Sequence, residues 1–121
     1  MVVDELDALR EKFDGCDTLA FADLSTQMIL VTNSGSTLRR EALDNLCAEA
    51  ALVLGSKGDP ALGQNPTNQA IVLNKRAARI FVRSAAEPSD ALCCICGPET
   101  DIAGLTAEAT ACLDRILAND A

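Results

Sequence analysis

The sequence predicts an α+β fold whose elements follow the order helix, two strands, helix, three strands, helix. Three segments carry apolar residues at the three- and four-residue spacing of a helix that buries one face. Between them lie short runs rich in apolar and β-branched residues, separated by residues that favour turns. Several of these runs are apolar at consecutive positions, which is typical of strands in a sheet that is covered on both sides.

The first helix is predicted over residues 2–13, with Gly15 as the residue that ends it. Its apolar positions recur at spacings of four, three and four residues: Val2, Leu6, Leu9 and Phe13. The stretch TLAFADLSTQMILVTN then contains two β-rich runs with a polar break at STQ. We interpret it as a hairpin with strands near 18–24 and 27–33.

A second helix is predicted near residues 38–54, and Gly55 follows it directly as a C-terminal stop. Its apolar stripe comprises Leu43, Leu46, Cys47, Ala50 and Leu54. Further alanines widen its surface of small side chains: Ala42, Ala48 and Ala51. This surface would allow the helix to pack closely against another helix.

A loop is predicted over residues 55–68, GSKGDPALGQNPTN, because this stretch is rich in Gly and Pro. It contains Gly and Lys but lacks the spacing of a phosphate-binding loop. Three strands are predicted after it, at 69–74 (QAIVLN), 79–84 (RIFVRS) and 91–96 (ALCCIC). The last helix is predicted near 104–118, and its apolar stripe comprises Leu105, Ala109, Cys112, Leu113 and Ile116.

The length and charge of the chain limit its class. Its 121 residues predict a single domain over residues 1–121. The net charge of −8 disfavours binding to nucleic acid, whose phosphates are also negative. No apolar run approaches the roughly 20 residues that span a membrane. The charged N-terminal stretch lacks the pattern of a signal peptide, so we expect a cytoplasmic protein that does not bind membranes.

The chain contains no His, which removes the commonest catalytic designs. Ser-His and Cys-His pairs, His general bases and zinc sites with imidazole ligands are all excluded. The carboxylates of DELD and EPSD are more often solvated or turn-forming than catalytic. We therefore expect no catalytic residue, no metal and no cofactor.

Three of the six cysteines lie in the run ALCCIC. In a strand Leu92, Cys94 and Cys96 share one face, and Cys93 lies on the other. Two thiols on one face do not make a structural zinc site, which needs four ligands. We interpret the run as a buried central strand with free thiols. The alternative is a redox or metal sensor that uses Cys93, Cys94 and Cys96, which requires exposed thiols in positive surroundings.

Residues 69–86 form a basic island in an acidic protein. They carry no acidic residue and four basic ones: Lys75, Arg76, Arg79 and Arg83. One interpretation is that these charges protect an exposed strand from pairing with other chains. The other is that they form a docking surface for an acidic partner, or for acidic parts of a second copy.

The elements together resemble the roadblock/dynein light-chain family over nearly the whole chain. The resemblance lies in the hairpin TLAFADLSTQMILVTNSG, the helix REALDNLCAEAALVLG and the hairpin QAIVLNKRAARIFVRS. The strongest local match is DALCCICGPETDIAGLTAEATACLDRIL. The chain departs from the family in its first hairpin turn, where many members have Gly and this chain has LSTQM. The loop at 55–68 is also fairly long.

The resemblance implies a five-stranded antiparallel sheet with the first and last helices on one face and the middle helix on the other. It also implies a homodimer that pairs the third strand with its copy and packs the middle helices together. The residues implied at that interface are Gln69, Ala70, Ile71, Val72, Leu73, Cys47, Ala50, Ala51 and Leu54. The run QAIVLN fits this role because it carries no charge that would block pairing.

The resemblance further implies a function without catalysis. Members look like adaptors and regulators, among them bacterial partners of small Ras-like GTPases, and some accelerate GTP hydrolysis by repositioning residues of the GTPase. A further hypothesis is a small-ligand sensor of the profilin-like or PAS type. The lack of Trp, Tyr and His leaves few groups to line a polar ligand pocket.

Overall fold

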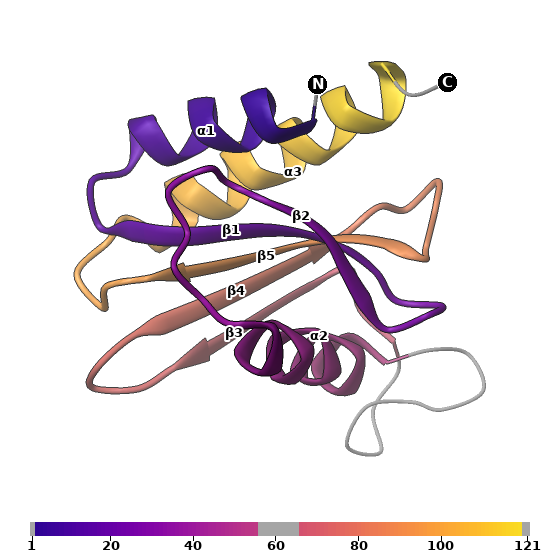
Figure 1. The fold of residues 1–121 in the computed structure, drawn as a ribbon, viewed down its shortest axis with the longest axis horizontal. Helices are drawn as coiled ribbons and strands as arrows, with labels where there is room; N and C mark the ends of the chain where they lie inside the picture. The colour runs from indigo at the N-terminus through magenta and orange to yellow at the C-terminus, as the bar shows by residue number, and fades with distance from the viewer. Residues whose placement is uncertain (1, 56–65, 120–121) are drawn as a thin grey trace.

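The computed structural model describes residues 2–55 and 66–119. Within them three helices pack on one five-stranded antiparallel sheet (Figure 1). The elements are α1 (Val2–Lys12), β1 (Cys16–Asp23), β2 (Met28–Thr32), α2 (Arg40–Leu54), β3 (Gln69–Leu73), β4 (Ala78–Arg83), β5 (Asp90–Cys96) and α3 (Ile102–Asn119). The strands are ordered β2-β1-β5-β4-β3. The predicted α+β class and the predicted order of elements are confirmed.

The boundaries differ from the sequence prediction by a few residues. The strand β1 begins at Cys16 instead of residue 18, and α3 begins at Ile102 instead of residue 104. Residues 56–65 of the predicted loop, which include most of GSKGDP, lie outside the described residues. Among the helices of the described ranges, none has the length and apolar character to cross a membrane.

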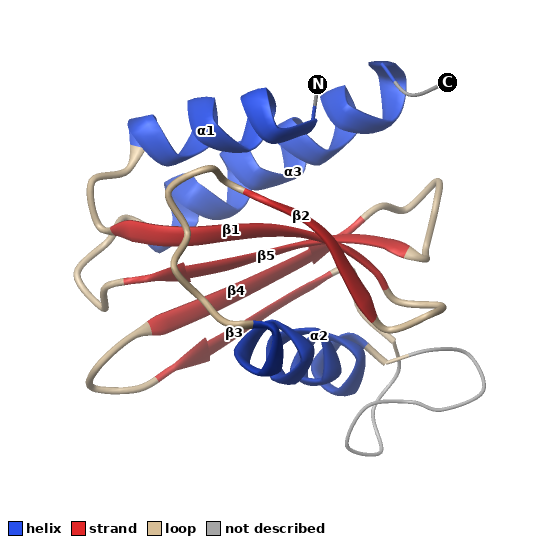
Figure 2. Ribbon diagram, in the orientation of Figure 1, coloured by secondary structure: helices blue, strands red, loops and turns tan. Residues whose placement is uncertain are grey.

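The two faces of the sheet carry separate cores, with α1 and α3 on one side and α2 on the other (Figure 2). The strand β5 shows the expected alternation. Leu92, Cys94 and Cys96 lie in the core under α1 and α3, whereas Cys93 lies in the core under α2. The arrangement of helices that the family resemblance implied is therefore confirmed.

The helices α1 and α3 run antiparallel beside each other. Glu5 near the start of α1 pairs with Arg115 near the end of α3 at 3.0 Å, and Lys12 pairs with Glu108 at 3.1 Å. The start of α1 and the end of α3 therefore lie at the same end of the helix pair (Figure 1).

The turn between β1 and β2 closes without a Gly. Gln27 takes the left-handed conformation with φ 55°. The Asp23 carboxylate accepts hydrogen bonds from the Ser25 amide at 3.0 Å and from the Thr26 hydroxyl at 3.0 Å. The hydrogen bond from the Ser25 side chain, together with these, lowers the pKa of Asp23. Local side-chain bonds thus replace the backbone freedom that Gly would give.

Candidate interaction surfaces

The strand β3 forms one edge of the sheet, and its outer side has no strand partner in the described part of the chain. The Asn74 amide donates to Ala77 O at 3.0 Å, and the Arg83 amide donates to Asn68 O at 2.8 Å. Because hydrogen-bonded pairs alternate along an antiparallel ladder, the odd-numbered residues Gln69, Ile71 and Leu73 direct their N–H and C=O groups outward. The groups of Ile71 and Leu73 point outward as donors and acceptors, whereas Gln69 bonds the Thr67 hydroxyl, which donates to Gln69 O at 3.1 Å and accepts from Gln69 N–H at 3.4 Å.

The side chains of β3 are uncharged and unevenly covered. Ala70 and Val72 face α2 and are partly buried. Ile71 pairs with Ile80 and therefore lies on the other face, beyond the cover that α3 gives to β4. As a result the Ile71 side chain is 50% exposed and Leu73 is 60% exposed. The β3 edge, Gln69–Leu73, therefore combines outward-facing backbone groups at Ile71 and Leu73 with exposed apolar side chains.

Three of the four α2 residues that the resemblance implied at the dimer interface are buried within the chain itself. Cys47, Ala50 and Leu54 are fully buried against the sheet of their own chain. Their apolar stripe is what attaches the helix to the sheet, so it is not on the surface. The exposed large hydrophobic residue of α2 is Leu52, at 56%. Leu52 follows Glu49 by one helical turn, on the flank of α2 that faces β4 and β3.

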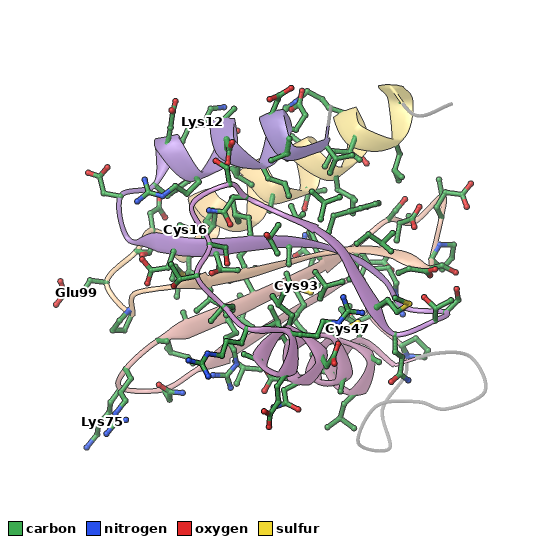
Figure 3. All side chains as sticks on the ribbon, viewed as in Figure 1. Lys12, Cys16, Cys47, Lys75, Cys93 and Glu99 are labelled. Atoms are coloured by element: carbon green, nitrogen blue, oxygen red, sulfur yellow. The ribbon has the colours of Figure 1, made fainter. Side chains whose placement is uncertain are left out.

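The basic residues of the second hairpin divide into two groups. Arg79 pairs with Glu49 of α2, with Nη2 to Oε2 at 3.0 Å. Arg83 donates to Leu54 O at 3.2 Å and to Thr67 O at 2.6 Å, and also to Gly55 O. Both side chains therefore have partners within the chain. Lys75 and Arg76 lie in the exposed turn, and Lys75 projects away from the body of the protein (Figure 3).

A cleft of about 640 Å³ lies between the β1–β2 turn, the end of α2 and the segment before β5. Leu24, Gln27, Ala51 and Pro88 line it, and Arg83 is the charged residue among its lining. The Arg83 guanidinium is already engaged by backbone carbonyls. Ala51, which was implied at the dimer interface, therefore faces this cleft on the opposite flank of α2.

All six cysteines are free and buried. Burial raises the pKa of Cys16 to about 12, and burial also raises the pKa values of Cys93, Cys94 and Cys96. Within residues 2–55 and 66–119, no group of three or more Cys, Asp or Glu side chains is placed to hold a metal ion. These surroundings do not favour the sensor that used Cys93, Cys94 and Cys96, because reactive thiols need exposure and a low pKa.

Comparison with known proteins finds similar structures but no similar sequence. No protein-family model and no curated protein matches the sequence. A roadblock/LC7 domain from Streptomyces avermitilis superposes with a TM-score of 0.74 at 14% identity, over 95% of this chain and 93% of that one. MglB from Myxococcus xanthus gives a TM-score of 0.72 at 12% identity, over 95% and 90%. A structure of MglB with a tetrameric arrangement gives 0.70 at 12% identity, over 94% and 83%. The chain therefore has the roadblock/LC7 fold.

Proposed function

We propose that this chain is a cytoplasmic, non-catalytic interaction module, a single roadblock-like domain over residues 1–121 that acts as a homodimer and regulates a small Ras-like GTPase. The observation that carries the proposal is the β3 edge, which is regular, uncharged and without a strand partner among residues 2–55 and 66–119. The likeness to MglB supports it, and so does the arrangement of several copies in one of the MglB structures.

The proposed dimer pairs β3 with β3 of a second copy about a two-fold axis. Antiparallel pairing of the outward groups of β3 joins two five-stranded sheets into one. In a register centred on Ile71, the two Ile71 side chains lie opposite each other, and each Leu73 lies opposite Gln69 of the second copy. Both α2 helices come to lie on the same face, where their Leu52 flanks approach each other.

The native mass of the purified chain tests the dimer, by light scattering after size-exclusion chromatography. The wild type is expected at twice the chain mass. Ile71→Lys places a charge at the centre of the β3 edge and is expected to give a monomer. Leu30→Lys is the matched control on the opposite edge strand, and it is expected to remain a dimer. A monomeric wild type, or an Ile71→Lys variant that stays dimeric, contradicts this assembly.

The GTPase assignment has its own test. Small Ras-like GTPases are loaded with GDP or with a non-hydrolysable GTP analogue, and their binding to the immobilised chain is measured. A regulator is expected to prefer one nucleotide state, because its surface has to distinguish the two conformations of the GTPase. Equal binding in both states, or no binding by a chain that is dimeric, contradicts the regulatory role and leaves the dimer intact.

A further inference from the structure

Cys16 and Cys96 lie directly opposite each other on the central strands β1 and β5. Just beyond them the Gly97 amide donates to Gly15 O at 2.9 Å. This pattern identifies a non-hydrogen-bonded pair, in which the Cα atoms are about 4.5 Å apart. Disulfides span Cα separations of about 4.4–6.8 Å. The backbone therefore already has a separation that a cross-strand disulfide accepts.

A β-bulge turns both thiols toward the same core. The register of β1 against β5 shifts between Cys16 and Thr18, so Asp17 is an extra residue. Strict alternation from Thr18 through Asp17 would direct Cys16 to the α2 face. Because of the bulge, Cys16 and Cys96 both lie in the core under α1 and α3, at 0% and 1% exposure. The bulge thus places both thiols in one core, where Cys16 Sγ lies 3.8 Å from Thr18 O and Cys96 Sγ lies 3.6 Å from Ala78 O, so a disulfide requires the side chains to rotate toward each other.

A buried hydroxyl lies beside the pair. Within the described residues Thr100 Oγ1 is buried without a hydrogen-bond partner of ordinary geometry. Burial raises the pKa of the neighbouring Cys96 thiol, and the Thr100 hydroxyl lowers it. Gly15 makes room for this hydroxyl, because a Cβ at that position would clash with Thr100 Oγ1. The Thr100 donor is therefore available to a negatively charged sulfur at Cys96.

We propose that Cys16 and Cys96 are a thiol pair that a low-molecular-weight disulfide converts into an intrachain disulfide. The Cys96 thiolate attacks one sulfur of the reagent, forms a mixed disulfide and releases one thiolate. The Cys16 thiolate then attacks Cys96 Sγ and releases the second. The two protein thiols are oxidised, the reagent is reduced to two thiols, and the protons of Cys16 and Cys96 end on these products.

The position of Cys96 at the end of β5 determines how a reagent reaches the thiol pair. Cys96 is the last residue of β5, and the short segment 97–101 that covers it carries the exposed residues Pro98 and Glu99 (Figure 3). Cys16 and Cys96 are buried and burial raises the pKa of each thiol, so the reaction requires this segment to open and admit water and the reagent. The pair shares Cys96 with the sensor hypothesis but does not use Cys93 or Cys94, which point to opposite faces of the sheet. The bond joins the two central strands and closes most of the chain into one loop, which restricts the unfolded state.

The test uses the full chain under native conditions with oxidised glutathione. Remaining thiols are alkylated and the digested chain is mapped by mass spectrometry. The expected result is the loss of two hydrogens and a linked peptide that joins Cys16 to Cys96. The melting temperature is expected to rise by about 5 °C or more, and reduction should reverse the rise. No cross-link, a link between other cysteines, or glutathione that stays on Cys96 would overturn the proposal.

Three variants test which side chains the reaction requires. Cys96→Ala is expected to abolish the cross-link, whereas Cys47→Ala, which removes an equally buried thiol, is expected to keep it. Thr100→Val removes the hydroxyl and is expected to shift the pH of half-maximal reaction rate upward. A Thr100→Val variant with an unchanged pH profile overturns the role of that hydroxyl. Where Cys96→Ala fails to fold, the wild-type peptide map alone decides.

Discussion

The two edge strands of the sheet differ in backbone regularity and not in the exposure of their apolar side chains. Leu30 of β2 is 52% exposed and Ile71 of β3 is 50% exposed. In β2, however, Leu30 is the extra residue of a bulge, because Val31 pairs with Phe21 and Ile29 pairs with Ala22. The strand β3 pairs with β4 without interruption. A bulge interrupts the regular row of backbone donors and acceptors with which another strand would pair. The strand β3, which has no bulge, is therefore the edge suited to pairing.

The largest expected difference between the edges comes from the same substitution made on each. Ile29 is buried between β2 and α2, so Ile29→Ala is expected to cost about 3 kcal/mol in the free energy of unfolding. Ile71→Ala removes an exposed side chain and is expected to cost under about 1 kcal/mol within one chain. Urea denaturation at several protein concentrations measures both. Ile71→Ala should instead weaken the dimer. If it lowers the free energy of unfolding as much as Ile29→Ala does at every protein concentration, the comparison of the two edges is contradicted.

The next effect concerns how β3 is held in place. Arg83 bonds to carbonyls at the end of α2 and at Thr67, just before β3. Arg83→Ala leaves these acceptors without their donor and is expected to cost about 2 kcal/mol of unfolding free energy. Lys75→Ala in the exposed turn is the matched control, expected to stay within about 0.5 kcal/mol. Thermal unfolding of both variants measures this, and equal stability would show that Arg83 does not anchor β3.

A deletion can make the two edges alike. Removal of Leu30 takes out the extra residue while the pairs Phe21–Val31 and Ala22–Ile29 are retained. The strand β2 then becomes regular, and each chain has two open edges. We expect assemblies larger than a dimer, because two edges on one chain permit open-ended association. Sedimentation velocity measures their size, and a variant that remains no larger than the wild type contradicts the role given to the bulge.

The smallest effect is a pH dependence at the β2 turn. The folded-state pKa of Asp23 is lowered by its hydrogen bonds. The stabilisation is therefore complete above the unfolded pKa of about 3.9 and is lost as the pH falls through the lower folded value. Asp23→Asn should show a weaker loss of stability on acidification than the wild type. Parallel melting curves from neutral pH down to about pH 3 test this, and identical acid profiles would contradict it.

The sequence predicts the elements well because each depends on a local pattern. The alternation in ALCCIC correctly separates Cys93 from Cys94, and the stripe Leu46, Cys47, Ala50 correctly predicts α2. The surfaces are harder to predict. A stripe shows that a helix is covered but not by what, and the one on α2 faces its own sheet. Arg79 and Arg83 look like free charges until the fold brings Glu49 and the end of α2 beside them.

The bulges are the other part that the sequence does not reveal. Neither Asp17 nor Leu30 has a residue type that marks an extra position, since bulges arise from the pairing of two strands. The bulge at Asp17 decides the direction of Cys16, and the one at Leu30 separates the two edges. Both therefore change the surface or the core through a one-residue shift that only the pairing shows.

The antiparallel pairing of α1 with α3 has a practical consequence for tracking this protein in living cells. The contact of Glu5 with Arg115 places the beginning of α1 next to the end of α3, on the side of the sheet opposite α2. Labels placed at the start of α1 and at the end of α3 therefore lie close together. Donor and acceptor dyes on these two helix ends would give a strong energy transfer, which serves as an internal ruler for labels placed elsewhere.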